Sequence, residues 1–277
     1  MVVWITKADG SKEPFKVNKI KRTARRAGAS PKLASEIVRE VARSVYDGIP
    51  SKEVFRIIMR MLKREEPRVA CRYDLKAAIM QLGVAGFNFE QLMAEILKEH
   101  GYQAKTNQMV QGFCVQHEID IVAEKDGVSY LIECKYHHQP GSFTGLKETM
   151  YTWARLQDLQ KGASAKKCGH FDVAWLITNT KFSTDSMKYA SCNGVQLLGW
   201  SHPKGASLQE LIETKGLYPV TVLQLDPDLL SVLGKNKLLL LRDLLKFDTI
   251  RLARMLGLSE QKVKKMQDLA SQVLERR

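Results

Sequence analysis

Two carboxylates and a lysine occupy positions from which they could act together on a phosphodiester. Glu133 and Lys135 are two residues apart in 129–136, a segment whose composition predicts a β-strand. Side chains at that spacing on a strand point to the same face. Asp120 belongs to a second predicted strand, 118–124, which a short turn joins to the first. If the two strands pair, both carboxylates and the ammonium group converge on one patch of the sheet.

Such a trio suits metal-dependent hydrolysis of a phosphodiester. The oxygen ligands of Asp120 and Glu133 are those that Mg²⁺ (or Mn²⁺) prefers, and the ion would neutralise the phosphate and activate a bound water. Lys135 is expected to carry a positive charge and to stabilise the transition state electrostatically. Action as a general base would first require it to lose its proton. The alternative is an ordinary salt bridge between Glu133 and Lys135 on an edge strand.

The charge of the chain predicts an anionic partner. The formal net charge is +13 over 277 residues. Residues 1–86 hold 19 Lys and Arg against 9 Asp and Glu, whereas residues 87–216 hold 13 against 14. A strongly basic segment beside a nearly neutral one favours nucleic acid or polyphosphate as the partner. The alternative is that the chain is one of many soluble proteins that are basic without binding nucleic acid.

The composition argues against membrane and disulfide-rich classes. No apolar run reaches the roughly 20 residues that span a bilayer, and the first residues lack the layout of a signal peptide. We therefore expect a soluble, cytoplasmic protein with no membrane partner. The five cysteines are scattered and include no CxxC pair, which predicts free thiols rather than a disulfide framework or a structural zinc site.

Helix and strand patterns divide the chain into three predicted domains, 1–86, 87–216 and 217–277. The first reads as a β-hairpin followed by four helices, with Gly83 and Gly86 at its end. The second alternates strands with helices, which predicts a mixed sheet flanked by helices. The third reads as a small all-helical domain. Besides the two strands named above, the middle segment has expected strands at 172–178 and 195–198 and expected helices near 89–101, 143–160 and 183–191. The expected fold class is therefore a multidomain α/β protein.

Several motifs of the middle segment occur in a characteristic order: Ile119-Asp120, Glu133-Cys134-Lys135, Leu176-Ile177-Thr178-Asn179 and Asn193-Gly194-Val195-Gln196. In this order they resemble the Mrr-like branch of the PD-(D/E)xK restriction-endonuclease-like superfamily. The resemblance covers 87–200 and implies a restriction-endonuclease-like sheet. It also implies that Asp120 and Glu133 are metal ligands, that Lys135 is catalytic and that Glu90 reaches the site from the first helix. Alternatively, Glu90 is a solvated helix residue.

The helix after the expected metal ligands departs from the family pattern. Mrr-like proteins often carry a QxxxY motif there, and the nearest match here is Lys147 with Tyr151. We expect these two residues to contact DNA. His117, His137 and His138 are close in sequence to the site and are expected to be surface or DNA-phosphate residues rather than metal ligands.

Two further motifs, Ile5-Thr6-Lys7-Ala8-Asp9-Gly10 and Val69-Ala70-Cys71-Arg72-Tyr73, frame the N-terminal segment. They resemble an ATP-cone, the regulatory nucleotide-binding domain of ribonucleotide reductases. The resemblance implies that Lys7, Glu13 and Lys19 bind ATP or dATP, and lysines on a turn and a helix start can neutralise phosphates. The family carries an arginine directly after the first of these lysines, where this chain has an alanine. The alternative is a cone fold that serves as a basic, DNA-contacting module.

The C-terminal segment carries Leu256-Gly257-Leu258-Ser259 between two helical patterns and resembles a helix-hairpin-helix module. Such modules grip the DNA backbone, so Lys262, Lys264 and Lys265 are expected DNA contacts. The alternative is a packing or dimerisation element.

These expectations favour a metal-dependent DNA endonuclease that acts in restriction or in repair and recombination and is regulated by ATP or dATP. Cleavage of both strands of a duplex would favour a homodimer. The alternative is a nucleotide-responsive DNA-binding regulator whose nuclease fold is inactive. The intact set of Asp120, Glu133 and Lys135 favours the enzyme, since a regulator needs none of the three.

Overall fold

The computed structural model describes residues 3–83 and 88–275, and the chain divides into two compact units. The terminal unit combines Met1–Gln81 with Tyr218–Arg277, and the central unit is Leu82–Leu217. The segments 1–86 and 217–277, which the sequence divides into two domains, thus fall largely within one compact unit. Gly86, which the sequence placed at a boundary, lies outside the described residues.

The N-terminal part of the terminal unit is a small sheet with helices. Its strands have the order β2-β1-β3, with β1 antiparallel to β2 and parallel to β3. The strands are β1 (Trp4–Thr6), β2 (Lys12–Pro14) and β3 (Ile49–Pro50), and the helices are α1 (Val17–Arg26), α2 (Pro31–Ser44), α3 (Ser51–Glu65), α4 (Pro67–Tyr73) and α5 (Leu75–Met80). The apolar stripe of α2 is buried as its spacing predicts, at Leu33, Ile37 and Val41. Ser30 caps this helix by accepting a hydrogen bond from the Leu33 amide at 3.2 Å.

The C-terminal part of the terminal unit is helical, as predicted. It consists of η1 (Val220–Leu223), α10 (Pro227–Lys235), α11 (Leu241–Leu244), α12 (Thr249–Leu256) and α13 (Glu260–Leu274). Helix α13 packs against α4. The Arg72 guanidinium donates two hydrogen bonds to the Val273 carbonyl, at 2.9 and 2.7 Å, and the Thr221 hydroxyl donates to the Ala78 carbonyl at 2.9 Å. These contacts explain why the two ends of the chain form one unit.

The central unit is a five-stranded mixed sheet with the order β10-β8-β6-β5-β4. Strands β4, β5 and β6 are antiparallel neighbours, and β6, β8 and β10 run parallel. The sheet strands are β4 (Gln103–Gln111), β5 (Gln116–Lys125), β6 (Val128–Lys135), β8 (Val173–Thr178) and β10 (Gln196–Leu198), and a separate pair is β7 (Phe143–Thr144) with β9 (Lys181–Phe182). Strand β4 was not among the predicted strands.

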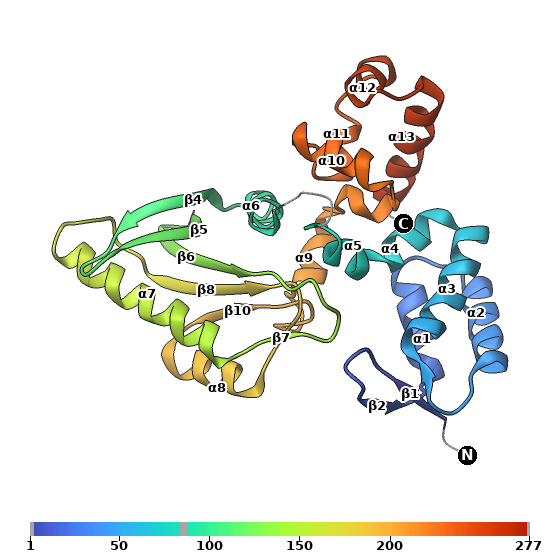
Figure 1. Ribbon diagram of the computed structural model, residues 1–277, viewed down its shortest axis with the longest axis horizontal. Helices are drawn as coiled ribbons and strands as arrows, with labels where there is room; N and C mark the ends of the chain where they lie inside the picture. Colours follow the sequence, from blue (N-terminus) through green and yellow to red (C-terminus); the bar gives the residue numbers. More distant parts are fainter. Residues whose placement is uncertain (1–2, 84–87, 276–277) are drawn as a thin grey trace. The chain divides into compact units, whose positions relative to one another are not determined.

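Helices cover both faces of this sheet (Figure 1). They are α6 (Phe89–Glu99), α7 (Leu146–Ser164), α8 (Thr184–Asn193) and α9 (Leu208–Lys215). Helices α7 and α8 pack together over the core that contains Leu131 and Leu176, whereas α6 packs on β4 and β5. The α/β fold class and the mixed sheet flanked by helices are therefore confirmed. None of the described helices has the length and apolar character required to span a bilayer.

Candidate functional site

Asp120 lies where β5 and β6 separate. The pairing of the two strands runs from Lys125 with Val128 to Ile121 with Ile132, and Asp120 is the residue of β5 just beyond this pairing. At this point its carboxylate, rather than a main-chain carbonyl, accepts the hydrogen bond of the Cys134 amide at 2.7 Å. This hydrogen bond fixes the carboxylate of Asp120 beside β6, next to Glu133.

The other edge of β5 is also unusual at this position. Thr106 of β4 pairs with Ile121 and Gln108 pairs with Ile119, so Asn107 stands opposite Asp120. Asn107 has a φ of 53°, a left-handed conformation that non-glycine residues adopt infrequently and asparagine more readily than most. The β4 backbone is thus locally distorted opposite Asp120, as is frequent at functional sites.

Glu133 is held by an arginine that sequence reasoning missed. The Arg155 guanidinium, from the middle of α7, donates to the Glu133 carboxylate and to the Glu118 carbonyl. The two side chains of the ion pair are 6% and 22% exposed, the arginine being the more buried. Arg155 also stands over the ring of Tyr151, with 5.3 Å from the guanidinium carbon to the ring centre. An arginine this buried beside a carboxylate fixes the orientation of Glu133.

Glu90 and Lys135 belong to the same electrostatic cluster. Burial raises the pKa of Glu90, and the nearby Asp120 carboxylate raises it further. Glu90 is the second residue of α6 and is half-buried, so the structure favours its proximity to the site over a fully solvated position. Lys135 has an exposed side chain, and its charge lowers the pKa of Glu133. The four residues expected from the sequence therefore lie within electrostatic reach of one another.

The carboxylates of Asp120 and Glu133 are partly buried and lie close enough to repel each other. Burial raises the pKa of Glu133 to about 7, with a further increase from Asp120, while Arg155 and Lys135 oppose it. Burial also raises the pKa of Asp120, against the hydrogen bond from Cys134 and the charge of Arg155. Carboxylates that are crowded and partly buried are those that a cation stabilises most.

The donor set fits a hard divalent cation. Within residues 3–83 and 88–275, no three His, Cys, Asp or Glu side chains are grouped closely enough to hold a metal ion. The expected ligand set is smaller, with two carboxylates from Asp120 and Glu133. Mg²⁺ is commonly bound through one or two carboxylates, and water completes its coordination. The residues present are therefore compatible with the ion that the sequence predicts.

Helix α7 presents the expected DNA contacts on the same side as Arg155. Lys147, Tyr151 and Arg155 follow one another at four-residue spacing, which places them along one face of the helix. Lys147 and Tyr151 are exposed, and Tyr151 is in contact with Arg155. Tyr151 thus lies about one helical turn, and Lys147 about two turns, from the arginine that holds Glu133.

The histidines near the site have structural partners. The His117 side chain is 11% exposed, and its Nε2 lies 2.8 Å from the Asp158 carboxylate, so this residue is more buried than the expected surface position. Although burial alone would raise it, the Cys114 amide and His117 lower the pKa of Asp158 to about 2. His137 contacts the Thr144 hydroxyl at 2.9 Å. His138 is exposed, as expected. All five cysteines are free, which confirms the prediction of scattered thiols.

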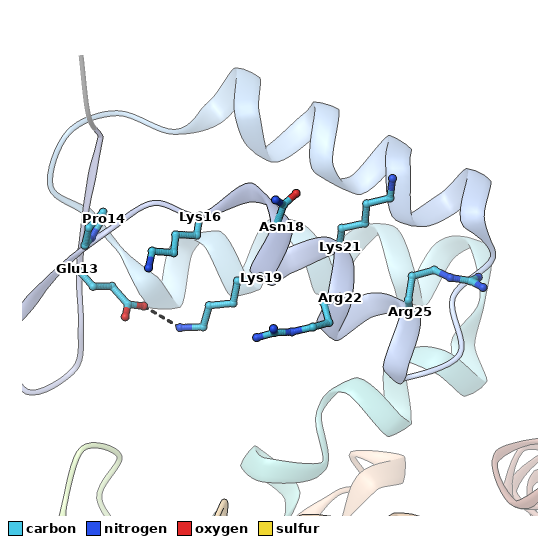
Figure 2. Close-up of a pocket in the computed structure, with 8 residues that line it drawn as sticks. All are labelled: Glu13, Pro14, Lys16, Asn18, Lys19, Lys21, Arg22 and Arg25. Atoms are coloured by element: carbon cyan, nitrogen blue, oxygen red, sulfur yellow. Dashed lines mark hydrogen bonds and ion pairs between the residues drawn. The ribbon is translucent and has the colours of Figure 1, made fainter. Parts of the chain in front are cut away.

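The residues expected to bind nucleotide meet at the hairpin of the terminal unit. Glu13 on β2 accepts from Lys7 at 2.8 Å and from Lys19, on α1, at 2.9 Å. Hydrogen bonds from these two lysines lower the pKa of Glu13. Glu13 and Lys19 border a cavity of about 710 Å³ (Figure 2), and Lys7 reaches it through its ion pair with Glu13.

The expected DNA contacts of the C-terminal helices lie on α13. Gly257 ends α12 with a φ of 64°, a left-handed conformation suited to glycine, and Ser259 caps α13. Lys262, Lys264 and Lys265 are exposed at the start of α13. Lys264 pairs with Asp268 at 2.8 Å, which leaves the other two as the stronger candidates for phosphate contact.

Comparisons with known proteins agree with this architecture. A family model described as restriction endonuclease matches residues 82–211, and one described as ATP cone domain matches residues 3–79. An uncharacterised protein of Archaeoglobus fulgidus is 45% identical over 182 residues, which are 66% of this chain and 99% of that protein. A crystal structure of a protein of unknown function is 42% identical, with a TM-score of 0.56, and the match covers 71% of this chain and 98% of that one. The chain therefore belongs to the Mrr-type restriction endonuclease family, with the catalytic domain of that family over residues 82–211 and an ATP cone domain over residues 3–79.

Proposed function

We propose that the protein is a metal-dependent DNA endonuclease that acts in restriction or repair. The observation that carries this proposal is the crowding of the Asp120 and Glu133 carboxylates where β5 and β6 separate. Both have a raised pKa within a restriction endonuclease domain. A protein that only binds DNA gains nothing from holding two partly buried carboxylates together, because the arrangement costs stability and repels phosphate.

In this proposal Asp120 and Glu133 hold Mg²⁺ (or Mn²⁺). When bound, the ion neutralises charge on the scissile phosphate and lowers the pKa of a coordinated water. The Cys134 amide orients the Asp120 carboxylate, and Arg155 orients that of Glu133. Arg155 is accordingly a positioning residue, whose guanidinium can hold one oxygen of Glu133 and leave the other for the ion.

The remaining charged residues act on substrate. Lys135 has an exposed side chain beside Glu133, from which its ammonium can stabilise the charge that develops on the phosphate. Glu90 can accept a hydrogen bond from water on the α6 side of the site. Lys147 and Tyr151 are exposed on α7, where they can contact the DNA backbone.

We also propose that the cone binds ATP or dATP through Lys7, Glu13 and Lys19 and thereby regulates cleavage. The Glu13 carboxylate holds both lysine ammonium groups within 3 Å, so the two cations are already gathered where a phosphate chain would need them. Lys262, Lys264 and Lys265 on α13 are proposed to add backbone contacts with DNA. Cleavage of both strands would require two copies of the chain, because one site cuts one strand.

A cleavage panel tests the nuclease. Plasmid, branched and single-stranded DNA are incubated with Mg²⁺ or Mn²⁺ and the wild-type protein, Asp120→Ala, Glu133→Ala or Lys135→Ala. Each substitution should abolish cleavage while DNA binding persists, because losing a metal ligand or a transition-state charge costs several kcal/mol of barrier. Glu124→Gln, on the exposed end of β5, is the matched control and should cleave like wild type.

Two outcomes would reject the assignment. Wild-type cleavage rates in Asp120→Ala or Glu133→Ala would mean that these carboxylates are not the metal ligands. No cleavage by the wild-type protein in any metal, combined with DNA binding that depends on nucleotide, would favour the regulator with an inactive nuclease fold.

A further inference from the structure

A groove beside α1 of the terminal unit is lined by several positively charged side chains, most of which form no ion pair with the residues that the structure describes. We call it the basic groove and define it by the residues that line the cavity of about 710 Å³, namely Glu13, Pro14, Lys16, Asn18, Lys19, Lys21, Arg22 and Arg25. Figure 2 shows the ends of Lys16, Lys19 and Arg22 directed towards the Glu13 side, with Lys21 and Arg25 further along the helix.

The cations of this groove outnumber its anions. Glu13 is the one acidic residue in the lining, and Lys7 and Lys19 already pair with it. Arg25 donates to the Ala29 carbonyl, which leaves its charge uncompensated. Within the described part of the chain, the side chains of Lys16, Lys21 and Arg22 form no ion pair or hydrogen bond. The groove therefore presents several positive charges that are available to a ligand.

Folding does not explain the concentration of charge on α1. The helix buries Ile20 and Ala24 and has no acidic residue in its first turn. Lys21 and Arg25 are four residues apart and Arg22 and Arg25 are three apart, spacings at which like charges destabilise a helix. All three side chains are exposed. The arrangement thus opposes helix formation slightly, and an anionic ligand would relieve that repulsion.

We propose that the basic groove binds the phosphodiester backbone of DNA. Helix α1 has 10 residues, which at about 1.5 Å per residue span about 15 Å. One strand of a duplex offers a phosphate about every 3.4 Å of its axis, so that length faces about four phosphates. The proposed nucleotide site uses Glu13 and Lys19 at one end of the groove, together with Lys7, which pairs with Glu13. Lys21, Arg22 and Arg25 lie beyond it, where a longer polyanion reaches them.

The choice of DNA as the polyanion rests on the proposed nuclease function. Contacts with the backbone carry no sequence information and serve to hold and orient the duplex. A nuclease domain whose own segment is nearly neutral gains affinity from such a contact elsewhere in the chain, because phosphate neutralisation releases counterions.

The test measures how DNA affinity depends on salt. The full chain and its Lys21→Gln/Arg22→Gln variant are titrated onto fluorescein-labelled duplex DNA in EDTA, which prevents cleavage, over a series of KCl concentrations. Losing two phosphate contacts should reduce the slope of log affinity against log salt by about 1.8. Arg39→Gln/Arg43→Gln removes the same charge from the exposed side of α2, outside the groove, and should change the slope much less.

Calorimetry with ATP separates the groove from the nucleotide site. The groove variant should retain the wild-type ATP affinity if wild type binds ATP, and its circular dichroism should be unchanged because both side chains are exposed. A slope equal to that of wild type, or one reduced equally in the α2 control, overturns the proposal. Tighter binding of an RNA duplex of equal length overturns DNA as the partner.

The experiment distinguishes failure of the groove proposal from failure of the proposed nuclease function. If the groove variant lowers the salt slope although wild type cleaves no DNA, the groove stands and the proposed nuclease function fails. If wild type cleaves DNA and the slope does not respond to the substitutions, the groove fails and the nuclease function stands.

Discussion

Replacing Glu133 by glutamine removes a partly buried negative charge that lowers the free energy of unfolding of the protein. Burial raises the pKa of Glu133 from 4.5 to about 7, although Arg155 and Lys135 oppose the increase. The side chain is 22% exposed, so solvent screens it only partly. At about 1.4 kcal/mol per pH unit, the ionised carboxylate destabilises the folded protein by about 3 kcal/mol.

The pH dependence follows from the direction of this shift. Between pH 4.5 and about 7 the folded chain binds a proton at Glu133 that the unfolded chain has released. The free energy of unfolding therefore falls as the pH rises through this window, and the loss is complete above it. Glu133→Gln carries no charge at any pH and can still accept the hydrogen bond of Arg155. In EDTA at pH 8 we expect the variant to be more stable than wild type by up to about 3 kcal/mol.

Urea unfolding followed by tryptophan fluorescence measures the difference. Trp153, Trp175 and Trp200 belong to the central unit, so the signal reports mainly on the fold that holds Glu133. The advantage of the variant should shrink towards pH 4.5, and saturating Mg²⁺ should stabilise only the wild type. A variant that is less stable than wild type at pH 8 in EDTA, or a difference independent of pH, would refute the reasoning. Glu124→Gln is the control for a change of charge on the surface.

Two other predictions concern the cations that pair with Glu133 and with Glu13. Arg155→Met should raise the pKa of Glu133 further and should destabilise the metal-free central unit by about 1–3 kcal/mol at pH 8, because the Glu133 carboxylate and the Glu118 carbonyl lose their donor; an unchanged urea midpoint would contradict this. Lys7→Ala and Lys19→Ala should each weaken ATP or dATP binding at least several-fold in calorimetry, because each removes a cation from the Glu13 cluster. The absence of heat with wild type at millimolar nucleotide would instead mean that Ala8 marks a cone without a ligand.

The parts of the site that the sequence predicted follow from strand geometry. Side chains alternate between faces of a strand, so Glu133 and Lys135 were certain to share a face once 129–136 was assigned as a strand. The tight turn at Asp126-Gly127 then brought Asp120 to the adjacent strand. Strand β8 was equally predictable, because its residues form a short apolar run that is buried in the structure.

Arg155 could not be predicted in the same way. Nothing in the sequence around it distinguishes a buried arginine from the solvated ones that are far more common. The one available signal was its position four residues after Tyr151, which placed both on one face of α7. Strand β4 was missed for a related reason, since it lies at the edge of the sheet and buries only Ala104 of its nine residues. A strand with so little burial has no clear apolar alternation.

The pairing of the two ends of the chain depends on contacts that no local pattern reports. Arg72 lies on α4 and donates to the carbonyl of Val273, more than 200 residues away in sequence. The guanidinium thereby supplies donors to carbonyl groups at the C-terminal end of α13, where helix carbonyls lack partners within the helix. The helices that precede and follow the central unit thereby become one body. The basic groove and the lysines of α13 consequently belong to the same compact unit, so any charge that a nucleotide adds at Lys7 and Lys19 acts on a unit that also carries the proposed DNA contacts. Linkage then requires that DNA changes the affinity for ATP by the same factor by which ATP changes the affinity for DNA.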